Sequence, residues 1–152
     1  MQKTNQVKME FDSLPENVSL ARVVVASFAT QSDITISELE EIKVAISEAV
    51  SNAIIHGYKN RIDGKVSLVL SRDMDVLTMT VEDYGVGIAD VEKALEPAYS
   101  SDPDRMGLGF VFMKSFMDHL EVQSQLGQGT RVAMSKKLPC KDAWAEDSDG
   151  QT

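Results

Sequence analysis

Alternating hydrophobic positions near the N-terminus predict that the fold begins with a strand. In residues 7–12, "VKMEFD", every second residue is apolar, which is typical of a half-buried strand. The next stretch, "NVSLARVVVASFA", has apolar side chains at helical spacing and predicts a helix. Ser13 followed three residues later by Glu16 fits a capping box. We therefore expect this helix to begin just after Ser13.

A second helix is predicted from Ser37, which forms another capping-box pattern with Glu40. The helical pattern continues as far as Gly57, and glycine favours a helix C-cap. A helical wheel places small and branched apolar residues on one face, which we expect to be buried. They are Ile42, Ile46, Ala49, Val50 and Ala53.

The second half of the chain predicts two hairpins separated by a loop and a helix. Strands are expected at about 65–71 and 76–82, and again at 121–125 and 130–137. Between the hairpins, "EPAYSSDPDR" reads as a loop. The stretch "MGLGF" then opens a helix whose inner face carries Phe110, Met113, Met117 and Leu120.

The predicted order of elements, β-α-α-β-β-loop-α-β-β, indicates the fold class. It favours an α/β (α+β) two-layer sandwich with helices on one face of a mixed, mainly antiparallel sheet. Residues 1–139 form one predicted domain. The tail from 140 to 152 is polar and acidic, and we expect it to be disordered.

The composition limits the cellular location and the kinds of partner that the protein can bind. The net charge of −9 argues against direct binding to nucleic acid or to an anionic membrane. It suits a basic partner, including one that itself binds nucleic acid. Cys140 is the only cysteine, which excludes a disulfide framework. The start "MQKTNQVKMEFD" lacks a signal-peptide core and no apolar run has transmembrane length, so we expect a cytoplasmic protein.

Polar side chains line the edge of the second predicted helix. In "SEAVSNAIIHGY", Glu48, Asn52 and His56 are four residues apart, so they drift by only about 40° per step around the helix. They can face a cleft beside the core, or they can form an ordinary solvated margin. The helical pattern by itself leaves both interpretations open.

Two glycine pairs follow at the ends of predicted elements. "DYGVGI" places Asp83 at a strand end before Gly85 and Gly87. Glycine lets the backbone approach a ligand closely, and a carboxylate can accept a hydrogen bond from an exocyclic amine. "MGLGF" places Gly107 and Gly109 at a helix start, where backbone N–H groups suit phosphate. Either pair alone is also explained by a turn.

The motifs in their order point to a family. The chain shows E-x-x-x-N on a helix, D-x-G-x-G after a strand, G-x-G before a helix and S-x-x-G-x-G-T in a hairpin. This set resembles the GHKL family of ATP-binding proteins over residues 7 to about 137. "SEAVSNAIIHGY", "SLARVVVASF" and "VEDYGVGI" resemble its anti-sigma-F branch, protein serine kinases of spore-forming bacteria. The resemblance implies a Bergerat-type fold that binds ATP or ADP and Mg²⁺.

The resemblance also implies roles for the polar side chains. Glu48 matches the catalytic base and Asn52 the Mg²⁺ ligand. Asp83 matches the carboxylate that recognises adenine, and Thr130 the residue that supports this contact. His56 lies at the cleft end of the same helix, where it either contacts phosphate or has a structural role.

Glycines and one arginine complete the implied ATP site. Gly85 and Gly87 match the family's hinge glycines, and Gly107 with Gly109 matches the phosphate cradle. The span 91–106 matches the ATP lid, although it is shorter than expected. Arg105 in this lid either reaches the γ-phosphate or is an exposed loop residue.

The partners are implied by the resemblance too. They are a sigma factor of the sigma-F type, an anti-anti-sigma protein that is phosphorylated on serine, and a second copy of the chain in a homodimer. Arg22 matches a helix arginine that contacts protein partners, although a solvated arginine would look the same.

Three other functions are weighed against this one. The first is a general-stress anti-sigma kinase of the same family. The second is a histidine-kinase catalytic domain, which would need a phosphoacceptor histidine; His56 and His119 are the only histidines, and neither lies on a free helix before the nucleotide motifs. The third is a nucleotide-gated binding module without catalysis, which would not need Glu48 as a base.

Overall fold

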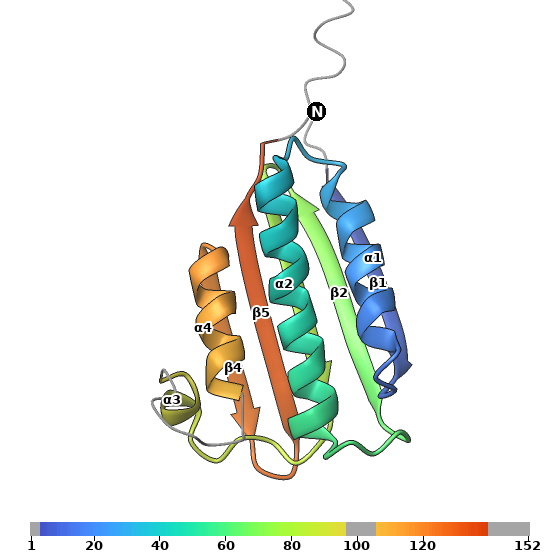
Figure 1. The fold of residues 1–152 in the computed structure, drawn as a ribbon, viewed down its shortest axis with the longest axis vertical. Coiled ribbons are helices and arrows are strands. Elements are labelled where there is room, and N and C mark those ends of the chain that lie inside the picture. Colours follow the sequence, from blue (N-terminus) through green and yellow to red (C-terminus); the bar gives the residue numbers. More distant parts are fainter. Residues whose placement is uncertain (1–3, 97–105, 140–152) are drawn as a thin grey trace, which may run out of the picture.

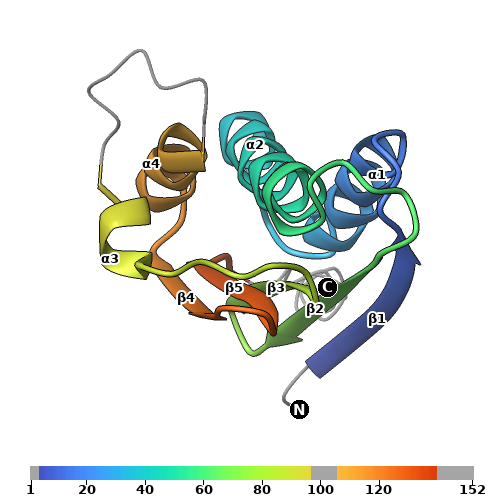
Figure 2. The same cartoon turned by 90° about the horizontal axis from the view of Figure 1, so that it is seen from below.

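One layer of helices covers one face of a five-stranded sheet (Figures 1 and 2). The computed structural model describes residues 4–96 and 106–139. Its elements are β1 (Thr4–Asp12), α1 (Asn17–Ala29), α2 (Ile36–Asn52), the π-helical turn η1 (Ala53–Gly57), β2 (Lys65–Asp73), β3 (Val76–Asp83), α3 (Val91–Ala94), α4 (Met106–Phe116), β4 (His119–Gln125) and β5 (Gly129–Lys137). The predicted order of the longer elements is confirmed, and the short helix α3 is an addition in the segment predicted as a loop.

The strands are arranged in the order β1-β2-β3-β5-β4. All four neighbouring pairs are antiparallel, so the expectation of a mixed sheet is wrong. The reason lies in the connections. The α1–α2 pair returns the chain so that β2 runs against β1. The connection through α4 leads from β3 to β4, which runs in the same direction as β3, but β5 lies between these two strands and is antiparallel to both. In the described part of the chain, β1 and β4 are the edges of this sheet.

The predicted start of α1 is wrong. The helix begins at Asn17, and its N-cap residue Glu16 makes no side-chain capping bond. The hydroxyl of Ser13 is buried instead. It donates to the carbonyl of Arg61 and accepts the N–H of Gly64 at 3.1 Å. Ser13 therefore ties the end of β1 to the turn before β2, a long-range contact that the local pattern does not contain.

The second capping box exists, but it lies two residues earlier than predicted. Thr35 accepts the backbone N–H of Glu38 at 3.1 Å, and the Glu38 carboxylate accepts the backbone N–H of Thr35 at 3.1 Å. In "TISELE" the pattern fits both Thr35 with Glu38 and Ser37 with Glu40. Thr35 has the extended backbone that an N-cap needs, so α2 begins at Ile36.

The main core lies between α2 and the middle strands of the sheet. All five residues predicted for the buried face of α2 are buried: Ile42, Ile46, Ala49, Val50 and Ala53. They belong to one cluster with Leu68, Leu70, Met79 and Val81 of the central strands. Of the residues predicted for the inner face of α4, Phe110, Met113 and Met117 are buried. The prediction is wrong for Leu120, because α4 ends at Phe116 and Leu120 lies in β4, where it is partly buried against the core. The core thereby holds α2 in a fixed position above the ends of β3 and β5.

Two predictions fall outside the described residues. Most of the span expected to form a lid, 97–105, and the tail, 140–152, are not among the residues that the structure describes. Within the described part, no helix is long and apolar enough to cross a membrane.

Candidate functional site

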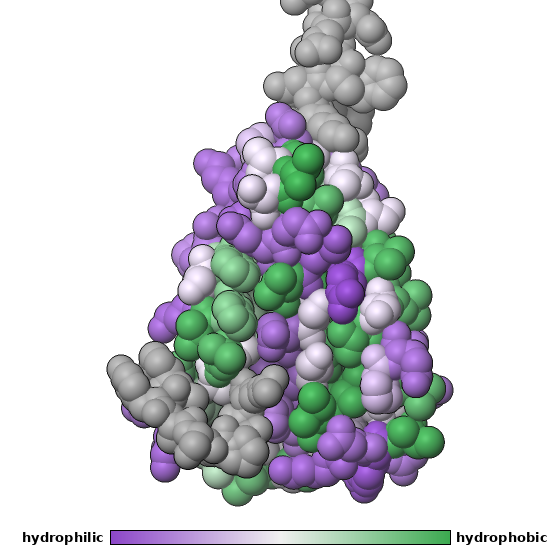
Figure 3. Space-filling view, viewed as in Figure 1, coloured by the Kyte–Doolittle hydropathy of each residue, from purple (hydrophilic) through white to green (hydrophobic). Residues whose placement is uncertain are grey.

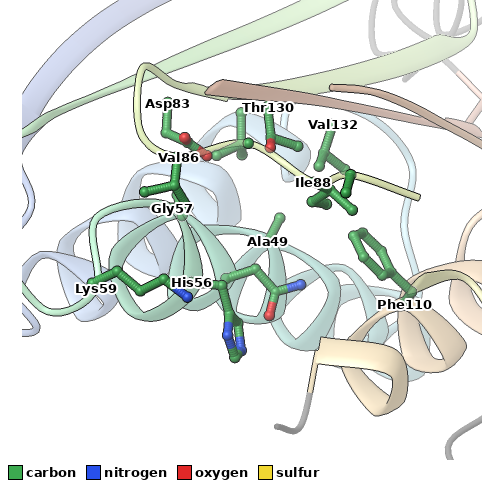
Figure 4. Close-up of a pocket in the computed structure, with 15 residues that line it drawn as sticks. Ala49, His56, Gly57, Lys59, Asp83, Val86, Ile88, Phe110, Thr130 and Val132 are labelled. Atoms are coloured by element: carbon green, nitrogen blue, oxygen red, sulfur yellow. The ribbon is translucent and has the colours of Figure 1, made fainter. Parts of the chain in front are cut away.

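A pocket of about 220 Å³ lies between α2 and the ends of β3 and β5 (Figure 4). Small residues of α2 and η1 form one wall, and apolar side chains form much of the rest. The lining residues are Ala49, Asn52, Ala53, His56, Gly57, Lys59, Val81, Asp83, Val86, Gly87, Ile88, Ala89, Phe110, Thr130 and Val132. The polar groups in this apolar pocket are few, as in sites that recognise a flat organic ligand.

Asp83 is the buried acid of the pocket. It ends β3 and is only 4% exposed. One carboxylate oxygen accepts the N–H of Gly85 at 2.9 Å. Burial raises the pKa of Asp83 to about 6, although hydrogen bonds from the backbone of Gly85 and Thr130 work in the opposite direction. A buried carboxylate with spare acceptor capacity can receive an N–H group of a ligand.

Gly57 makes room for this carboxylate. A Cβ atom at Gly57 would lie 2.7 Å from Cγ of Asp83, closer than non-bonded carbons can approach. The sequence analysis assigned Gly57 only as a helix end. Its second role depends on the packing of η1 against β3, so no local pattern could have revealed it.

Thr130 sits beside Asp83 in the sheet, because the two residues are paired between β3 and β5. Its hydroxyl is 2.8 Å from that of Ser124. Ser124 also accepts the N–H of Ile88 at 2.7 Å and donates to the carbonyl of Gly129 at 2.9 Å. Ser124 therefore joins the loop after β3 to the β4–β5 hairpin. It was part of the motif "SQLGQGT" but had not been predicted as a site residue.

The glycines after β3 pack against the protein's own backbone. A Cβ atom at Gly85 would lie 1.9 Å from the carbonyl oxygen of Gly57. Gly87 has a φ of +75°, and a Cβ atom there would lie 2.2 Å from the carbonyl oxygen of Gln125. Of the pair, Gly87 lines the pocket and Gly85 lies behind Asp83. Both glycines thus allow the loop to close over the strand ends.

Glu48 and Asn52 face the first turn of α4. A Cβ atom at Gly109 would lie 2.8 Å from Oε2 of Glu48 and 3.4 Å from Nδ2 of Asn52. Among the described residues, the buried Nδ2 of Asn52 has no hydrogen-bond partner. Burial raises the pKa of Glu48. The motifs E-x-x-x-N and G-x-G therefore meet in space, with an acid and an unsatisfied amide at the meeting point.

His56 belongs to the same polar stripe but not to the same regular helix. The α-helix ends at Asn52, and the next turn is π-helical, with the N–H of Tyr58 bonded to the carbonyl of Ala53 at 3.0 Å. The wider turn changes the angular position of each residue after Asn52. His56 lines the pocket, as does Lys59, which the sequence analysis did not select (Figure 4).

The remaining predicted residues lie at or beyond the margin of this site. Gly107 is half-buried in the first turn of α4, and Arg105 lies outside the described residues. Arg22 is on α1, where its Nε donates to the hydroxyl of Ser47 on α2 at 2.9 Å. This bond fixes a partly exposed guanidinium on the surface of the helical layer.

Comparison with known families agrees with this geometry. The family model described as "Histidine kinase-like ATPase domain" matches residues 11–136. Solved structures of two histidine kinases share the fold. The blue-light activated kinase domain of Erythrobacter litoralis EL346 superposes with a TM-score of 0.58 at 22% identity, over 82% of this chain and 60% of that one. The mycobacterial sensor kinase MprB gives 0.56 at 18% identity, over 89% and 100%. Fold and family model thus define a histidine kinase-like ATPase domain.

Proteins of similar sequence identify the family more closely. The anti-sigma F factor of Clostridium beijerinckii is 49% identical over 136 residues, 88% of this chain and 95% of that protein. The anti-sigma F factor of Bacillus subtilis is 44% identical over 88% of this chain and 93% of that protein. The chain therefore belongs to the anti-sigma F factor family, within the histidine kinase-like ATPase domains.

Proposed function

We propose that the chain is an anti-sigma factor that is also an ATP-dependent protein serine kinase. It binds and inhibits a sigma factor of the sigma-F type, and it phosphorylates a serine on the anti-anti-sigma protein that opposes it. The observation that carries this proposal is the identity of 44–49% to anti-sigma F factors over nearly the whole of both chains. The site residues provide the chemistry that the proposal needs.

Asp83 is proposed to recognise the adenine base. Its buried carboxylate accepts a hydrogen bond from the exocyclic amine of the base. Thr130 lies beside Asp83 and supports this contact through its hydroxyl. Gly57 keeps the space in front of the carboxylate open. The apolar side chains of Val81 and Ile88 then cover the faces of the base. An acceptor in an otherwise apolar pocket favours adenine over guanine, which carries a carbonyl oxygen at the corresponding position.

Glu48 is proposed to be the catalytic base. Burial raises its pKa, which brings the carboxylate closer to the operating pH at which a general base is efficient. The serine Oγ attacks the γ-phosphorus while its proton passes to Glu48. The bond between the γ-phosphorus and the β,γ-bridging oxygen breaks, and ADP leaves with that electron pair.

Asn52 is proposed to hold Mg²⁺. Its buried Nδ2 has no hydrogen-bond partner among the described residues, so nothing shown there prevents the amide from turning by 180° about its last torsion and presenting its oxygen, the atom that binds a hard cation. A single amide oxygen fits Mg²⁺, which takes few protein ligands and completes its shell with phosphate and water. When bound, the ion would neutralise charge on the phosphates.

Removal of this amide tests the assignment. Asn52→Ala is expected to weaken ATP binding in the presence of Mg²⁺ by at least tenfold, because the proposed protein ligand is lost. Titration calorimetry with and without Mg²⁺ measures the effect, with Ser51→Ala on the same helix as the control. Equal Mg²⁺ dependence in Asn52→Ala and the parent would contradict the role.

The sigma factor and the antagonist are proposed to contact the helical layer. Arg22 is fixed there by Ser47, and the acidic protein, with a net charge of −9, suits the basic surfaces with which a sigma factor binds DNA. Gel filtration of the chain with a purified sigma-F-type factor tests this part. Separate elution at micromolar concentrations in the presence of ATP would contradict it.

The kinase activity is tested with purified protein, Mg²⁺, γ-labelled ATP and a lysate of spore-forming cells. We expect label on one small protein as acid-stable phosphoserine, and no label with Glu48→Gln. Acid-labile label on histidine would instead support a histidine-kinase domain. ATP binding without any labelling would contradict kinase activity and leave a nucleotide-gated binding module.

A further inference from the structure

A row of three polar side chains crosses the neighbouring ends of β3, β5 and β4. Asp83 is the cross-strand partner of Thr130, and Thr130 is the partner of Ser124. Side chains of directly opposed residues stand on the same face of a sheet. Asp83 and Thr130 line the pocket on this face (Figure 4). Ser124 is not among the lining residues, so it can act on a bound nucleotide only through its neighbours.

The hydroxyl of Ser124 makes three hydrogen-bond contacts. They are with the N–H of Ile88 at 2.7 Å, the carbonyl of Gly129 at 2.9 Å and the hydroxyl of Thr130 at 2.8 Å. A serine hydroxyl has one proton to donate and two lone pairs that accept. Because an N–H only donates and a carbonyl only accepts, Ser124 accepts from Ile88 and gives its proton to Gly129. Its second lone pair must then accept the proton of Thr130.

This arrangement of protons fixes the direction of the Thr130 hydroxyl. The proton points toward Ser124, so the oxygen of Thr130 presents lone pairs to the pocket. The ionised carboxylate of Asp83, next to it in the sheet, is an acceptor as well. Two neighbouring acceptors are complementary to an amino group, which has two N–H bonds, and they repel a carbonyl oxygen.

We propose that Ser124 is a positioning residue for base recognition. By accepting the proton of Thr130, it keeps Thr130 an acceptor toward the pocket, and the site thereby selects a base with an exocyclic amine over one with a carbonyl at that position. The same hydroxyl holds the N–H of Ile88, whose residue lines the pocket. This role rests on the proposed function, in which the pocket binds the adenine of ATP.

Removal of the Ser124 hydroxyl tests the role. In Ser124→Ala, the Thr130 proton loses its acceptor and can turn toward the pocket, where it would donate to a carbonyl. Calorimetry with Mg²⁺ compares ATP with inosine triphosphate, which carries a carbonyl oxygen in place of the amine. We expect ATP affinity to fall about fivefold and the preference for ATP to shrink by at least about threefold, the size of one hydrogen bond. An unchanged preference would overturn the proposal.

A double-mutant cycle separates this role from a purely structural one. Thr130→Val removes the hydroxyl that Ser124 orients and keeps nearly the same shape. If Ser124 acts through Thr130, adding Ser124→Ala to Thr130→Val should not change the preference between the two nucleotides. The same change of preference in both backgrounds would overturn the proposal. Ser124→Thr keeps a hydroxyl at this position and should keep the preference of the parent.

A control on the same sheet accounts for the loss of a hydroxyl as such. Ser135→Ala removes a half-buried hydroxyl from β5 away from the pocket, and both affinities should stay those of the parent. Failure of the parent to bind ATP would contradict the proposed function together with this role. ATP binding by the parent, with the same preference in Ser124→Ala, would overturn the role of Ser124 alone.

Spectroscopy provides a measurement that needs no variant. In the parent, the hydroxyl proton of Thr130 should exchange slowly with water, because it is held by Ser124. It should also show a nuclear Overhauser effect to the β-protons of Ser124. Exchange as fast as that of a solvent-exposed threonine hydroxyl would overturn the proposal.

Discussion

Glu48 lies half-buried between α2 and α4, and burial raises its pKa. Glu48→Gln keeps the shape of the side chain but removes its ability to take a proton. We expect ATP affinity within about threefold of the parent and phosphotransfer lower by 10²–10⁴, the usual contribution of a general base. Calorimetry measures the affinity and labelled ATP the transfer. Phosphotransfer equal to that of the parent would disprove the role.

Asp83 connects nucleotide binding to pH. Its pKa of about 6 means that the carboxylate gains a proton as the pH falls through this value, and the neutral acid is a weaker acceptor for adenine. ATP affinity is therefore expected to fall about tenfold from pH 7.5 to pH 5. Calorimetry across this range measures the change. Asp83→Asn should bind ATP weakly at each pH, and pH-independent affinity in the parent would contradict the assignment.

The raised pKa of Asp83 also predicts how the stability of the fold changes with pH. The pKa of Asp83 is raised from 3.8 in the unfolded chain to about 6 in the fold, so the folded state binds more protons between these values. The contribution of Asp83 to stability is present below pH 4 and is lost as the pH rises through 6. Consequently, Asp83→Asn should melt at a higher temperature than the parent at pH 7.5, and this advantage should shrink toward pH 4.

Gly109 leaves room for the Glu48 carboxylate beside the first turn of α4. In Gly109→Ala, the new Cβ would lie 2.8 Å from Oε2 of Glu48, and the flexible end of Glu48 would have to move. Alanine is also the better helix former, by up to about 1 kcal/mol. We expect a melting temperature within a few degrees of the parent and at least tenfold slower phosphotransfer.

A change on the exposed side of the same helix provides the control for Gly109→Ala. Ser115→Ala alters α4 away from Glu48, so it should change neither the melting temperature nor the rate of phosphotransfer. If Gly109→Ala kept full activity, α4 would not position the base, and the contact between the two motifs would be only structural.

The helical layer carries an apolar surface at one side of the molecule. On α1, Val23 is 67% and Leu20 44% exposed, and Val7 on the edge strand β1 is 36% exposed. Figure 3 shows hydrophobic side chains breaking the polar surface on the side where α1 lies. We propose that a second copy of the chain covers this surface, in a dimer that brings the two α1 helices and β1 edges together.

A charge at the centre of this surface tests the dimer. Val23→Asp would bury a carboxylate in the proposed interface, so it should shift the protein from dimer to monomer at micromolar concentration. Sedimentation velocity measures the shift. Ile36→Asp is the matched control, since Ile36 is 82% exposed at the start of α2. Equal sedimentation of Val23→Asp and the parent as dimers would contradict this surface.

The order of elements and the buried face of α2 could be predicted from the amino-acid sequence alone, because periodicity is a local property. It also singled out Asp83, Asn52 and Thr130, which the structure brings into one pocket. One of its errors was local: Ser37 was taken for the cap that Thr35 forms. Overlapping capping patterns differ only in which residue adopts the extended backbone, and the packing of the helix decides that.

The contacts between segments that are distant in the sequence became visible only in the folded chain. Gly57 lies under Asp83, and Gly109 lies against Glu48, although each pair is separated by more than 20 residues. The sequence analysis did not select Arg72, which is 2% exposed in the fold. Such contacts depend on the angle and distance at which helices pack on the sheet, and these are set by the whole core. A local pattern can therefore name the groups of a site, while packing decides which of them touch.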